Sequence, residues 1–315
     1  MIKIFSFIIL TRNNPDYLKK CLNHLDDQTC TFWKAYVVDT SDKKNVNLNE
    51  VECSKYAENV THISNIPEIG FAEKNNTIIK HILSMSKKIE FICLLNDDAY
   101  INKDFVKDME WYAYKYPTFS AFSPLYMYNI NKIQVVGGGY FTDKSPCGEE
   151  QLLHNLYINS LNDKEKQEVY NIINTPTKID FGYGAAIVYR TNLFEKVGYL
   201  DPVFRHGFDE PDFAKRMELK GEKILYTPTI VTHVCGGSSK NKSFFKNLHI
   251  ILPMNRAHLY FLLKHYPLKF VFKKELNRLQ EKVLHPKGLL IEIYCIIWNL
   301  LRIKSTRQKY KSLHL

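Results

Sequence analysis

The 315-residue chain lacks the cysteine patterns of disulfide-framed and zinc-binding proteins. None of its seven cysteines belongs to a C-x-x-C pair, their number is odd, and Cys93 lies inside an apolar run of strand length. A disulfide framework uses paired cysteines, and a structural zinc site uses closely spaced ones. The pattern therefore argues against both and predicts a reducing compartment.

The chain also lacks internal repeats and long apolar runs, and we do not expect its amino terminus to be a secretion signal. The apolar segment Ile4–Leu10 is followed by Thr11 and Arg12 where a secretion signal needs small residues, so we expect a buried strand there. The most apolar part of the tail, Gly288–Ile303, contains Glu292 and falls short of the ~20 residues of a membrane-spanning helix. With 45% hydrophobic and 24% charged residues, the composition is that of a globular protein of one large or two modest domains.

Negative charge is scarce in one part of the chain, its tail. Residues 241–315 contain 15 Lys and Arg but three acids, whereas residues 1–240 contain 28 basic and 30 acidic residues. We expect the tail to be a basic amphipathic segment that lies on an anionic membrane surface. Packing on the main domain or in a homodimer interface are the alternatives. A nucleic-acid partner is not expected, because the body is near neutral and carries no recognised binding module.

In the first 117 residues, apolar strand segments alternate with helical ones. We predict strands at 2–10, 33–38, 60–63 and 91–95, and helices from Pro15, over 71–85 and over 104–116. This alternation is typical of an α/β fold with a mostly parallel sheet. The second half is less regular: we predict strands at 119–127, 133–140, 179–189, 224–226 and 230–234, helices at 192–197 and 212–220, and a polar insertion or lid at 149–175.

Polar residues follow three of the predicted strands. Asn96-Asp97-Asp98 directly follows an apolar strand, and Thr11-Arg12 and Asp39 follow the first and second strands. In an open α/β sheet these groups meet at the carboxyl edge, where ligands bind. Carboxylate oxygens suit Mg²⁺ or Mn²⁺, which suit a diphosphate, and Asp39 could accept hydrogen bonds from a ribose or a base. Helix capping and turn formation are the alternatives.

Three further segments could carry chemistry. Lys74 and Asn75, near a helix start after Gly70, could meet phosphate or nucleobase, or form a solvated helix face. His233 ends a strand before a Gly-Gly-Ser-Ser loop and could reach a metal or a diphosphate, or be structural. Asp209-Glu210 heads a helix, where acids favour the macrodipole; alternatively one of the two acts as a general base, with a pKa raised by its neighbour.

Taken in order, these segments resemble the family 2 glycosyltransferases of the GT-A fold, particularly the bacterial rhamnosyltransferase-like branch. The match runs from about Ile2 to about Pro267. It is carried by the opening strand into Thr11-Arg12-Asn13, by Val37-Val38-Asp39-Thr40-Ser41, by Gly70-Phe71-Ala72-Glu73-Lys74-Asn75-Asn76, by Asn96-Asp97-Asp98, and by Val197-Gly198-Tyr199-Leu200-Asp201 leading to Asp212-Phe213-Ala214-Lys215-Arg216.

The resemblance implies a UDP- or dTDP-sugar donor and a Mn²⁺ or Mg²⁺ ion at the family's DxD position, where Asn96 replaces the first acid. Asp98 would then be a metal ligand, with His233 as a second candidate, and Asp97 would contact the donor's sugar or ribose. The other positions expected to bind the donor are Thr11, Arg12, Asp39, Lys74, Asn75 and Asn96.

The resemblance also implies a single in-line displacement with inversion at the anomeric carbon. The family's Glu-Asp pair reads Asp209-Glu210 here, so Glu210 falls on the position of the base, and the reversed order leaves open which acid serves. Gly182, Tyr183 and Asp212, together with the insertion at 149–175, would flank a glycan or lipid-linked acceptor. The implied pathway is bacterial surface polysaccharide assembly, in the cytoplasm or on the inner face of the cell membrane.

We therefore expect a GT-A (Rossmann-like) domain over residues 1–240, with a donor half at 1–117 and an acceptor half at 118–240. A helical, basic extension would cover residues 241–315. A sugar nucleotidyltransferase is the alternative enzyme, but it needs a Gly-rich basic loop where Thr11-Arg12-Asn13-Asn14 stands. Two candidate functions are not enzymatic: a nucleic-acid-binding protein that uses the tail, and a catalytically inactive scaffold.

Overall fold

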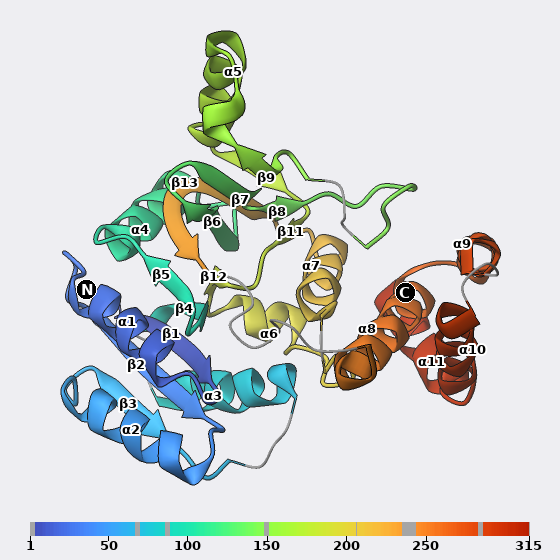
Figure 1. The fold of residues 1–315 in the computed structure, drawn as a ribbon, viewed down its shortest axis with the longest axis horizontal. Helices are drawn as coiled ribbons and strands as arrows, with labels where there is room; N and C mark the ends of the chain where they lie inside the picture. Colours follow the sequence, from blue (N-terminus) through green and yellow to red (C-terminus); the bar gives the residue numbers. More distant parts are fainter. Residues whose placement is uncertain are drawn as a thin grey trace.

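The computed structural model describes residues 4–66, 70–85, 89–147, 151–205, 207–234, 244–282 and 286–314. They form a mixed α/β fold with a central sheet flanked by helices (Figure 1). The strands are β1 (Ile4–Thr11), β2 (Trp33–Asp39), β3 (Val60–Ile63), β4 (Ile89–Asn96), β5 (Ala99–Ile101), β6 (Ala121–Asn129), β7 (Lys132–Val136), β8 (Gly138–Gly139), β9 (His154–Tyr157), β10 (Thr177–Ile179), β11 (Phe181–Gly182), β12 (Ala186–Arg190) and β13 (Ile224–His233). The α-helices are α1 (Pro15–Asp26), α2 (Lys43–Ser54), α3 (Phe71–Met85), α4 (Phe105–Lys115), α5 (Asp163–Ile173), α6 (Leu193–Val197), α7 (Asp209–Leu219), α8 (Phe244–His265), α9 (Leu268–Lys282), α10 (Pro286–Leu300) and α11 (Ile303–His314).

The first half of the chain builds a parallel sheet around β1. Strand β1 pairs with β2 on one side and β4 on the other, and β2 pairs with β3, all in parallel. Alternate residues of β1 face opposite layers: Phe5, Phe7 and Ile9 pack with α1 and α4, whereas Ile8 packs with α3. Because both faces are covered, β1 is apolar almost throughout, as expected for a central parallel strand.

The second half adds strands that make the sheet mixed. The main order is β10-β13-β6-β12-β4-β1-β2-β3, with β12 antiparallel to both β4 and β6. The two strands predicted at 224–226 and 230–234 are one strand, β13, whose pairing with β6 shifts register between Tyr226 and Ile230. Pro228 lies in that gap and has no N–H to donate, which explains the interruption. The strand predicted at 179–189 is instead divided among β10, β11 and β12.

Sequence analysis missed helix α2, and the reason is local. Asn49 and Cys53 are its buried residues, so the helix carries no apolar stripe at a 3.6-residue period. Its start is marked only by Asp42, whose carboxylate accepts a hydrogen bond from the Asn45 N–H at 3.0 Å. The insertion predicted at 149–175 contains β9, which pairs with β7 of the main sheet, and α5, which stands away from the body of the molecule (Figure 1); residues 148–150 lie outside the described part.

The C-terminal helices lie against one side of the sheet domain (Figure 1). Helix α8 contacts α9, α10 and α11, and α11 also contacts α7. A small apolar core forms there, in which Phe204 of the loop before α7 packs with Tyr260 and Phe261 of α8. Among the described helices, none has both the length and the hydropathy to cross a bilayer.

Candidate active site

Three strand ends converge at one edge of the sheet. Thr11 at the end of β1 stands opposite Asp39 of β2, and the preceding residue, Leu10, stands opposite Asn96 of β4. The Thr11 hydroxyl donates a hydrogen bond to Asp97 Oδ2 at 2.7 Å. Burial raises the pKa of Asp97 to about 7, although this hydrogen bond opposes the shift. The register of parallel strands thus brings together the polar groups that sequence analysis singled out.

Asp39 is held by its neighbour Ser41 and by two residues that sequence analysis missed, Asn49 and His62. Its carboxylate accepts hydrogen bonds from Asn49 Nδ2 at 2.8 Å and from the Ser41 N–H at 2.9 Å, and it lies 3.0 Å from His62 Nε2. Burial alone would raise the pKa of Asp39, but the hydrogen bonds from His62, Ser41 and Asn49 outweigh it and leave the pKa lowered. The carboxylate is therefore kept ionised and fixed in orientation.

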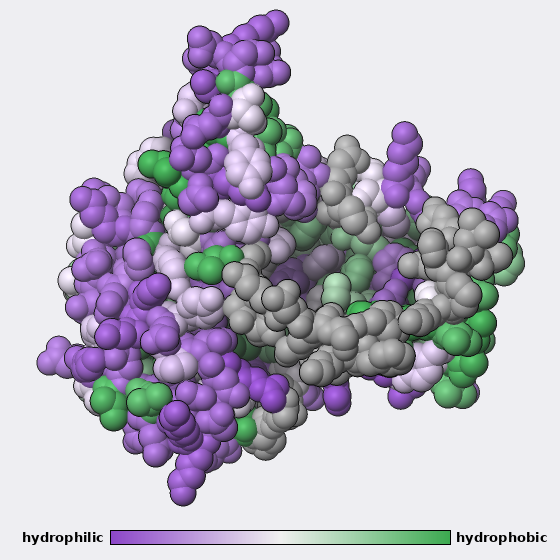
Figure 2. Space-filling view, viewed as in Figure 1, coloured by the Kyte–Doolittle hydropathy of each residue, from purple (hydrophilic) through white to green (hydrophobic). Residues whose placement is uncertain are grey.

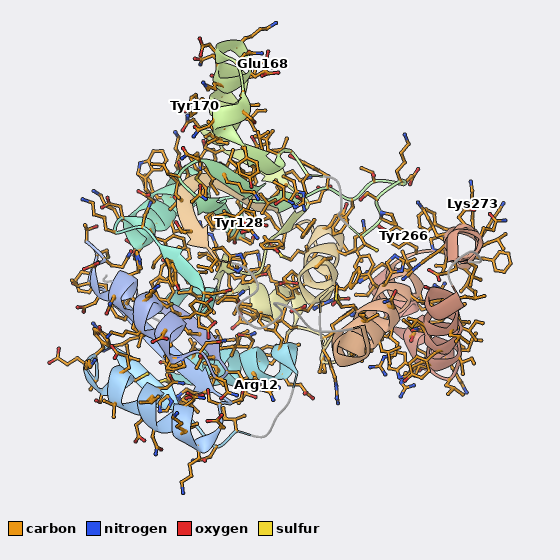
Figure 3. All side chains as sticks on the ribbon, in the orientation of Figure 1. Arg12, Tyr128, Glu168, Tyr170, Tyr266 and Lys273 are labelled. Atoms are coloured by element: carbon orange, nitrogen blue, oxygen red, sulfur yellow. The ribbon has the colours of Figure 1, made fainter. Side chains whose placement is uncertain are left out.

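The side chains predicted to bind the donor near Asp39 differ in whether they are exposed or buried. Arg12 is exposed beyond the end of β1, where Figure 3 labels it, and Lys74 Nζ lies 3.1 Å from Thr40 Oγ1 at the end of β2. Asn75, by contrast, is buried in α3, where its Nδ2 donates to the Phe71 carbonyl. Its Oδ1 has no hydrogen-bond partner among the described residues. Arg12 and Lys74 thus lie at this edge, whereas the Asn75 side chain is buried within the turn of α3.

Asp98 and His233 are brought together by a strand pair. Strand β5 runs antiparallel to β13, with Ala99 opposite His233, and the Val234 N–H donates to the Asp98 carbonyl at 3.0 Å. As a result Asp98 Oδ1 lies 3.3 Å from His233 Nε2. The other ring nitrogen, Nδ1, lies 3.0 Å from Gln134 Oε1. An amide oxygen can only accept, so this contact is a hydrogen bond donated by Nδ1–H, and it holds the ring with Nε2 facing Asp98.

Asp209, which is buried, and Glu210, which is partly buried, form an acid pair at the start of α7. Burial raises the pKa of both carboxyls, and the charge of Glu210 raises that of Asp209 further. Asp209 is only 3% exposed, and its Oδ2 has no hydrogen-bond partner within the described part of the chain. The surface viewed in Figure 2 is hollowed where α7 lies in Figure 1.

The loop from Gly182 to Gly184 connects this acid pair with the Asp98–His233 pair. A Cβ built on Gly184 would lie 1.9 Å from Glu210 Oε1, so the carboxylate rests directly on the glycine. The neighbouring Tyr183 ring packs edge-on against His233 at 6.2 Å between centroids, and the Tyr183 carbonyl accepts a hydrogen bond from the Tyr126 hydroxyl. At Gly182 a Cβ would meet Ile187 Cδ1 at 2.4 Å. Both glycines are thus required for close packing.

Asp212, which we predicted to contact the acceptor, is instead buried in a cluster of ion pairs. Its carboxylate is fully buried and enclosed by two cationic side chains and a histidine: Arg216 Nε lies at 3.0 Å, Lys264 Nζ at 2.6 Å and His265 Nε2 at 2.8 Å. Burial would raise the pKa of Asp212, but the charges of Lys264 and Arg216 hold it well below its usual range. No acceptor can reach an enclosed carboxylate, so we withdraw Asp212 from the acceptor site.

We expect Gly184→Ala to displace the Glu210 carboxylate, because the new methyl group would occupy the same space. A misplacement of about 1 Å in an active site can cost about 10²-fold in rate, and overpacking costs about 1–3 kcal/mol of stability. Urea unfolding of Gly184→Ala, of Glu210→Asp and of the double variant checks the cause. Since Glu210→Asp withdraws the carboxylate, the glycine substitution should cost less stability in that background. Additive costs would show that Glu210 is not the obstacle.

Comparison with known proteins supports the family relationship that the sequence motifs indicate. The sequence pattern of glycosyl transferase family 2 matches residues 6–198. The chain is similar to rhamnosyltransferase WbbL of Escherichia coli (strain K12), with 22% identity over 250 residues, which cover 76% of this chain and 85% of that protein.

Two solved structures share the fold. GalNAc-T7, solved with UDP, GalNAc and Mn²⁺, superposes with a TM-score of 0.64 at 14% identity and covers 89% of this chain; the chain spans about half (51%) of that structure. The mannosyltransferase PcManGT from Pyrobaculum calidifontis, solved with GDP-Man and Mn²⁺, superposes with a TM-score of 0.51 at 12% identity, over 98% of this chain and 84% of that one. The expected GT-A fold is thereby confirmed.

Proposed function

Because the chain belongs to glycosyl transferase family 2, we propose that it moves one sugar from a nucleotide-diphosphate-sugar to an acceptor hydroxyl, with inversion at the anomeric carbon. The observation that carries this proposal is the Gly182–Gly184 loop. Tyr183 packs on His233, beside Asp98, while Gly184 touches Glu210. The groups suited to hold a diphosphate and the group suited to remove a proton therefore lie on either side of one short loop.

The donor nucleotide would bind at the converging strand ends. Thr11, Arg12, Asp39 and Lys74 would contact the nucleotide, with Asn96 and Asp97 nearer the sugar. Asp39 supports this assignment because its fixed, ionised carboxylate can accept hydrogen bonds from a ribose or a base. Asn75 would act from below, by shaping the start of α3. UDP and GDP-Man are the donor groups named for the two solved structures; for this chain we propose UDP or dTDP.

A Mn²⁺ or Mg²⁺ ion would be held by Asp98 and His233. Their ligand atoms lie 3.3 Å apart, near the ~3 Å between adjacent ligands of an octahedral ion with bonds of about 2.1 Å. Among the described residues no group of three or more His, Cys, Asp or Glu is placed to hold an ion, so the donor's diphosphate would complete the coordination. When bound, the ion would neutralise charge on the departing diphosphate.

Glu210 would be the general base. Asp209 is more deeply buried, whereas Glu210 lies against the loop that separates it from the donor side. Glu210 would accept the proton of the acceptor hydroxyl as that oxygen attacks the sugar. Its raised pKa brings the carboxylate closer to the pKa at which a base works best near neutral pH.

The acceptor would be a glycan or a lipid-linked sugar in bacterial surface polysaccharide assembly, on the cytoplasmic side of the membrane. Resemblance to the rhamnosyltransferase-like branch supports this pathway. We propose residues 1–240 as the catalytic unit, with the donor half at 1–117 and the acceptor half at 118–240. In that unit Gly182 and Tyr183 would border the acceptor, and residues 241–315 would form a separate helical region.

Thermal unfolding with a panel of nucleotide diphosphates and their sugars tests the donor site. With Mn²⁺ present and the ligand at about 100 times its dissociation constant, we expect a stabilisation of about 2.7 kcal/mol, a rise in Tm of roughly 5 °C. Asp98→Ala should remove the metal-dependent part of the rise. Asp163→Ala, an exposed acid on α5, is the matched control and should keep it. If no nucleotide stabilises the unaltered protein, the donor site is refuted and an inactive scaffold becomes the better description.

A further inference from the structure

Helix α10 has its polar side buried and its apolar side exposed, the opposite of a helix on a water-exposed surface. Its polar and small side chains point inward: Glu292, Cys295 and Asn299 are all at most 1% exposed. Glu292 pairs with Arg278 of α9 at 3.1 Å, and Asn299 Nδ2 donates to the Arg256 carbonyl of α8. The helix therefore docks on its neighbours through polar contacts, which leaves its apolar side outward.

The outward side of this helix, here called the outer face of α10, carries a row of exposed apolar side chains from Leu290 onward. Residues recur every three or four positions, as on one face of a helix. The most exposed is Leu301, at 80%, just beyond the helix end, followed by Leu290 at 69%. Figure 2 shows apolar surface at the edge of the molecule where α10 lies in Figure 1. The outer face consists of Leu290, Ile293, Tyr294, Ile297, Leu300 and Leu301.

The exposed charges described on α9, on α11 and just beyond the end of α10 are of one sign. Lys269 and Lys273 of α9, Arg302 and Lys304 beyond α10, and Lys311 of α11 are exposed, and Figure 3 places Lys273 at the outer edge of α9. The two tail acids whose side chains the structure describes, Glu275 and Glu292, are both buried. Exposed charge on this part of the molecule, as far as it is described, is thus wholly cationic.

Aromatic residues complete the pattern of an interfacial surface. Tyr294 is exposed and Trp298 half-buried on α10, and the guanidinium groups of Arg256 and Arg302 lie 4.9 and 4.0 Å from the centre of the Trp298 ring. Tyr and Trp favour the boundary between water and hydrocarbon, because one end of each ring is apolar and the other can stay hydrated. Arginines beside them are placed to meet lipid phosphates.

From the exposed apolar face, its cationic surroundings and its aromatic border, we infer that α10 docks on an anionic phospholipid surface. The apolar side chains enter the upper acyl region, and the lysines and arginines bind headgroup phosphates. A second copy of the chain fits less well. A two-fold pairing of this face would set like charges against each other, and nothing negative is exposed on the described part of the tail to offset them. Docking is independent of sugar transfer, so the two can fail separately.

Flotation with vesicles tests this inference on the full chain. Vesicles of phosphatidylcholine alone are compared with vesicles that also contain phosphatidylglycerol. We expect the protein to float with the anionic vesicles, less at high salt because screening weakens the phosphate contacts, and the Trp298 fluorescence to shift to the blue on binding. Leu290→Ser and Leu301→Ser should each lower the partition coefficient about ten-fold. Ile130→Ser, equally exposed at 85% in the turn after β6, is the matched control and should bind as before.

Three results would overturn the inference. The first is failure to bind either kind of vesicle. The second is binding that Leu290→Ser and Leu301→Ser leave unchanged, which would place the contact elsewhere. The third is a dimer in analytical ultracentrifugation that the same substitutions dissociate, with no vesicle binding, which would assign the outer face of α10 to a second copy. Circular dichroism of each variant shows that loss of binding is not loss of fold.

Discussion

Glu210→Gln is expected to lower kcat about 10³-fold while leaving donor binding intact. Removal of a general base typically costs 10²- to 10⁴-fold, and glutamine keeps the shape of the side chain that rests on Gly184. Donor-induced thermal stabilisation should persist, because the strand-end groups lie on the other side of the Gly182–Gly184 loop. Steady-state kinetics with the donor identified by thermal unfolding measure the first effect, and the thermal shift measures the second.

The pH dependence of activity offers a second test of the role of Glu210. Burial raises the pKa of both Asp209 and Glu210, and a base works only when it is ionised. Activity should therefore rise with pH through the raised pKa of this carboxyl pair, above the range of an exposed carboxylate. In Glu210→Gln that rise should disappear, because the residual reaction no longer depends on this ionisation.

Two further variants separate the base from its surroundings. Glu218→Gln, on the same helix but paired with Lys215 at the surface, is the control and should keep full activity and the pH profile. Asp209→Asn removes the carboxyl whose hydrogen bond lowers the pKa of Glu210, so the rise in activity should move to higher pH. If Asp209→Asn abolished turnover and Glu210→Gln retained it, the assignments of the two acids would be exchanged.

The spacing of apolar residues along the chain was enough to predict the central strands and helix α3. The strand ends at Thr11, Asp39 and Asn96 are visible because each follows an apolar run that only a buried strand explains. Parallel pairing of these strands then brings the three residues to one edge of the sheet, and this does not depend on the rest of the fold. Helix α3 was predicted with its observed bounds because its apolar residues recur at helical spacing.

Long-range partners could not be predicted in the same way. Asn49 and His62, which hold Asp39, come from a helix without an apolar stripe and from a neighbouring strand. Gln134, which orients His233, lies 99 residues away from it. The tail shows the same limit: its basic and apolar residues were recognised, but the inward polar face of α10 depends on contacts with α8 and α9 that no spacing reveals.

Lys264→Met is expected to lower the free energy of unfolding by about 3–5 kcal/mol, the usual cost of removing one partner from a buried ion pair. Lys264 Nζ lies between two buried carboxylates, at 2.7 Å from Asp201 Oδ2 and 2.6 Å from Asp212 Oδ1. Methionine fills the space but leaves the two acids facing each other with less compensation. Urea unfolding at neutral pH measures the loss.

Acid titration of stability checks the same mechanism. The charge of Lys264 overcomes burial and holds the pKa of Asp201 at about 2, below its ordinary 3.8, and that of Asp212 is also lowered. A depressed pKa means that the stabilisation is present above the ordinary value and is lost as pH falls through the folded-state value. The unaltered protein should thus lose stability between about pH 4 and pH 2. Lys264→Met, already destabilised at neutral pH, should lose less over that interval.

The matched control comes from the other lysine on Asp201. Lys309 Nζ also lies 2.9 Å from Asp201 Oδ2, but its side chain is 44% exposed, so Lys309→Met should cost less than about 1 kcal/mol. The difference between the two lysines bears on catalysis, because Lys264 ties α8 to α7, whose first residues are Asp209 and Glu210. Lys264→Met should therefore lower kcat as well, since a looser α7 misplaces the proposed base. Equal effects of the two substitutions on stability would show that burial of the cluster is not what fixes α7.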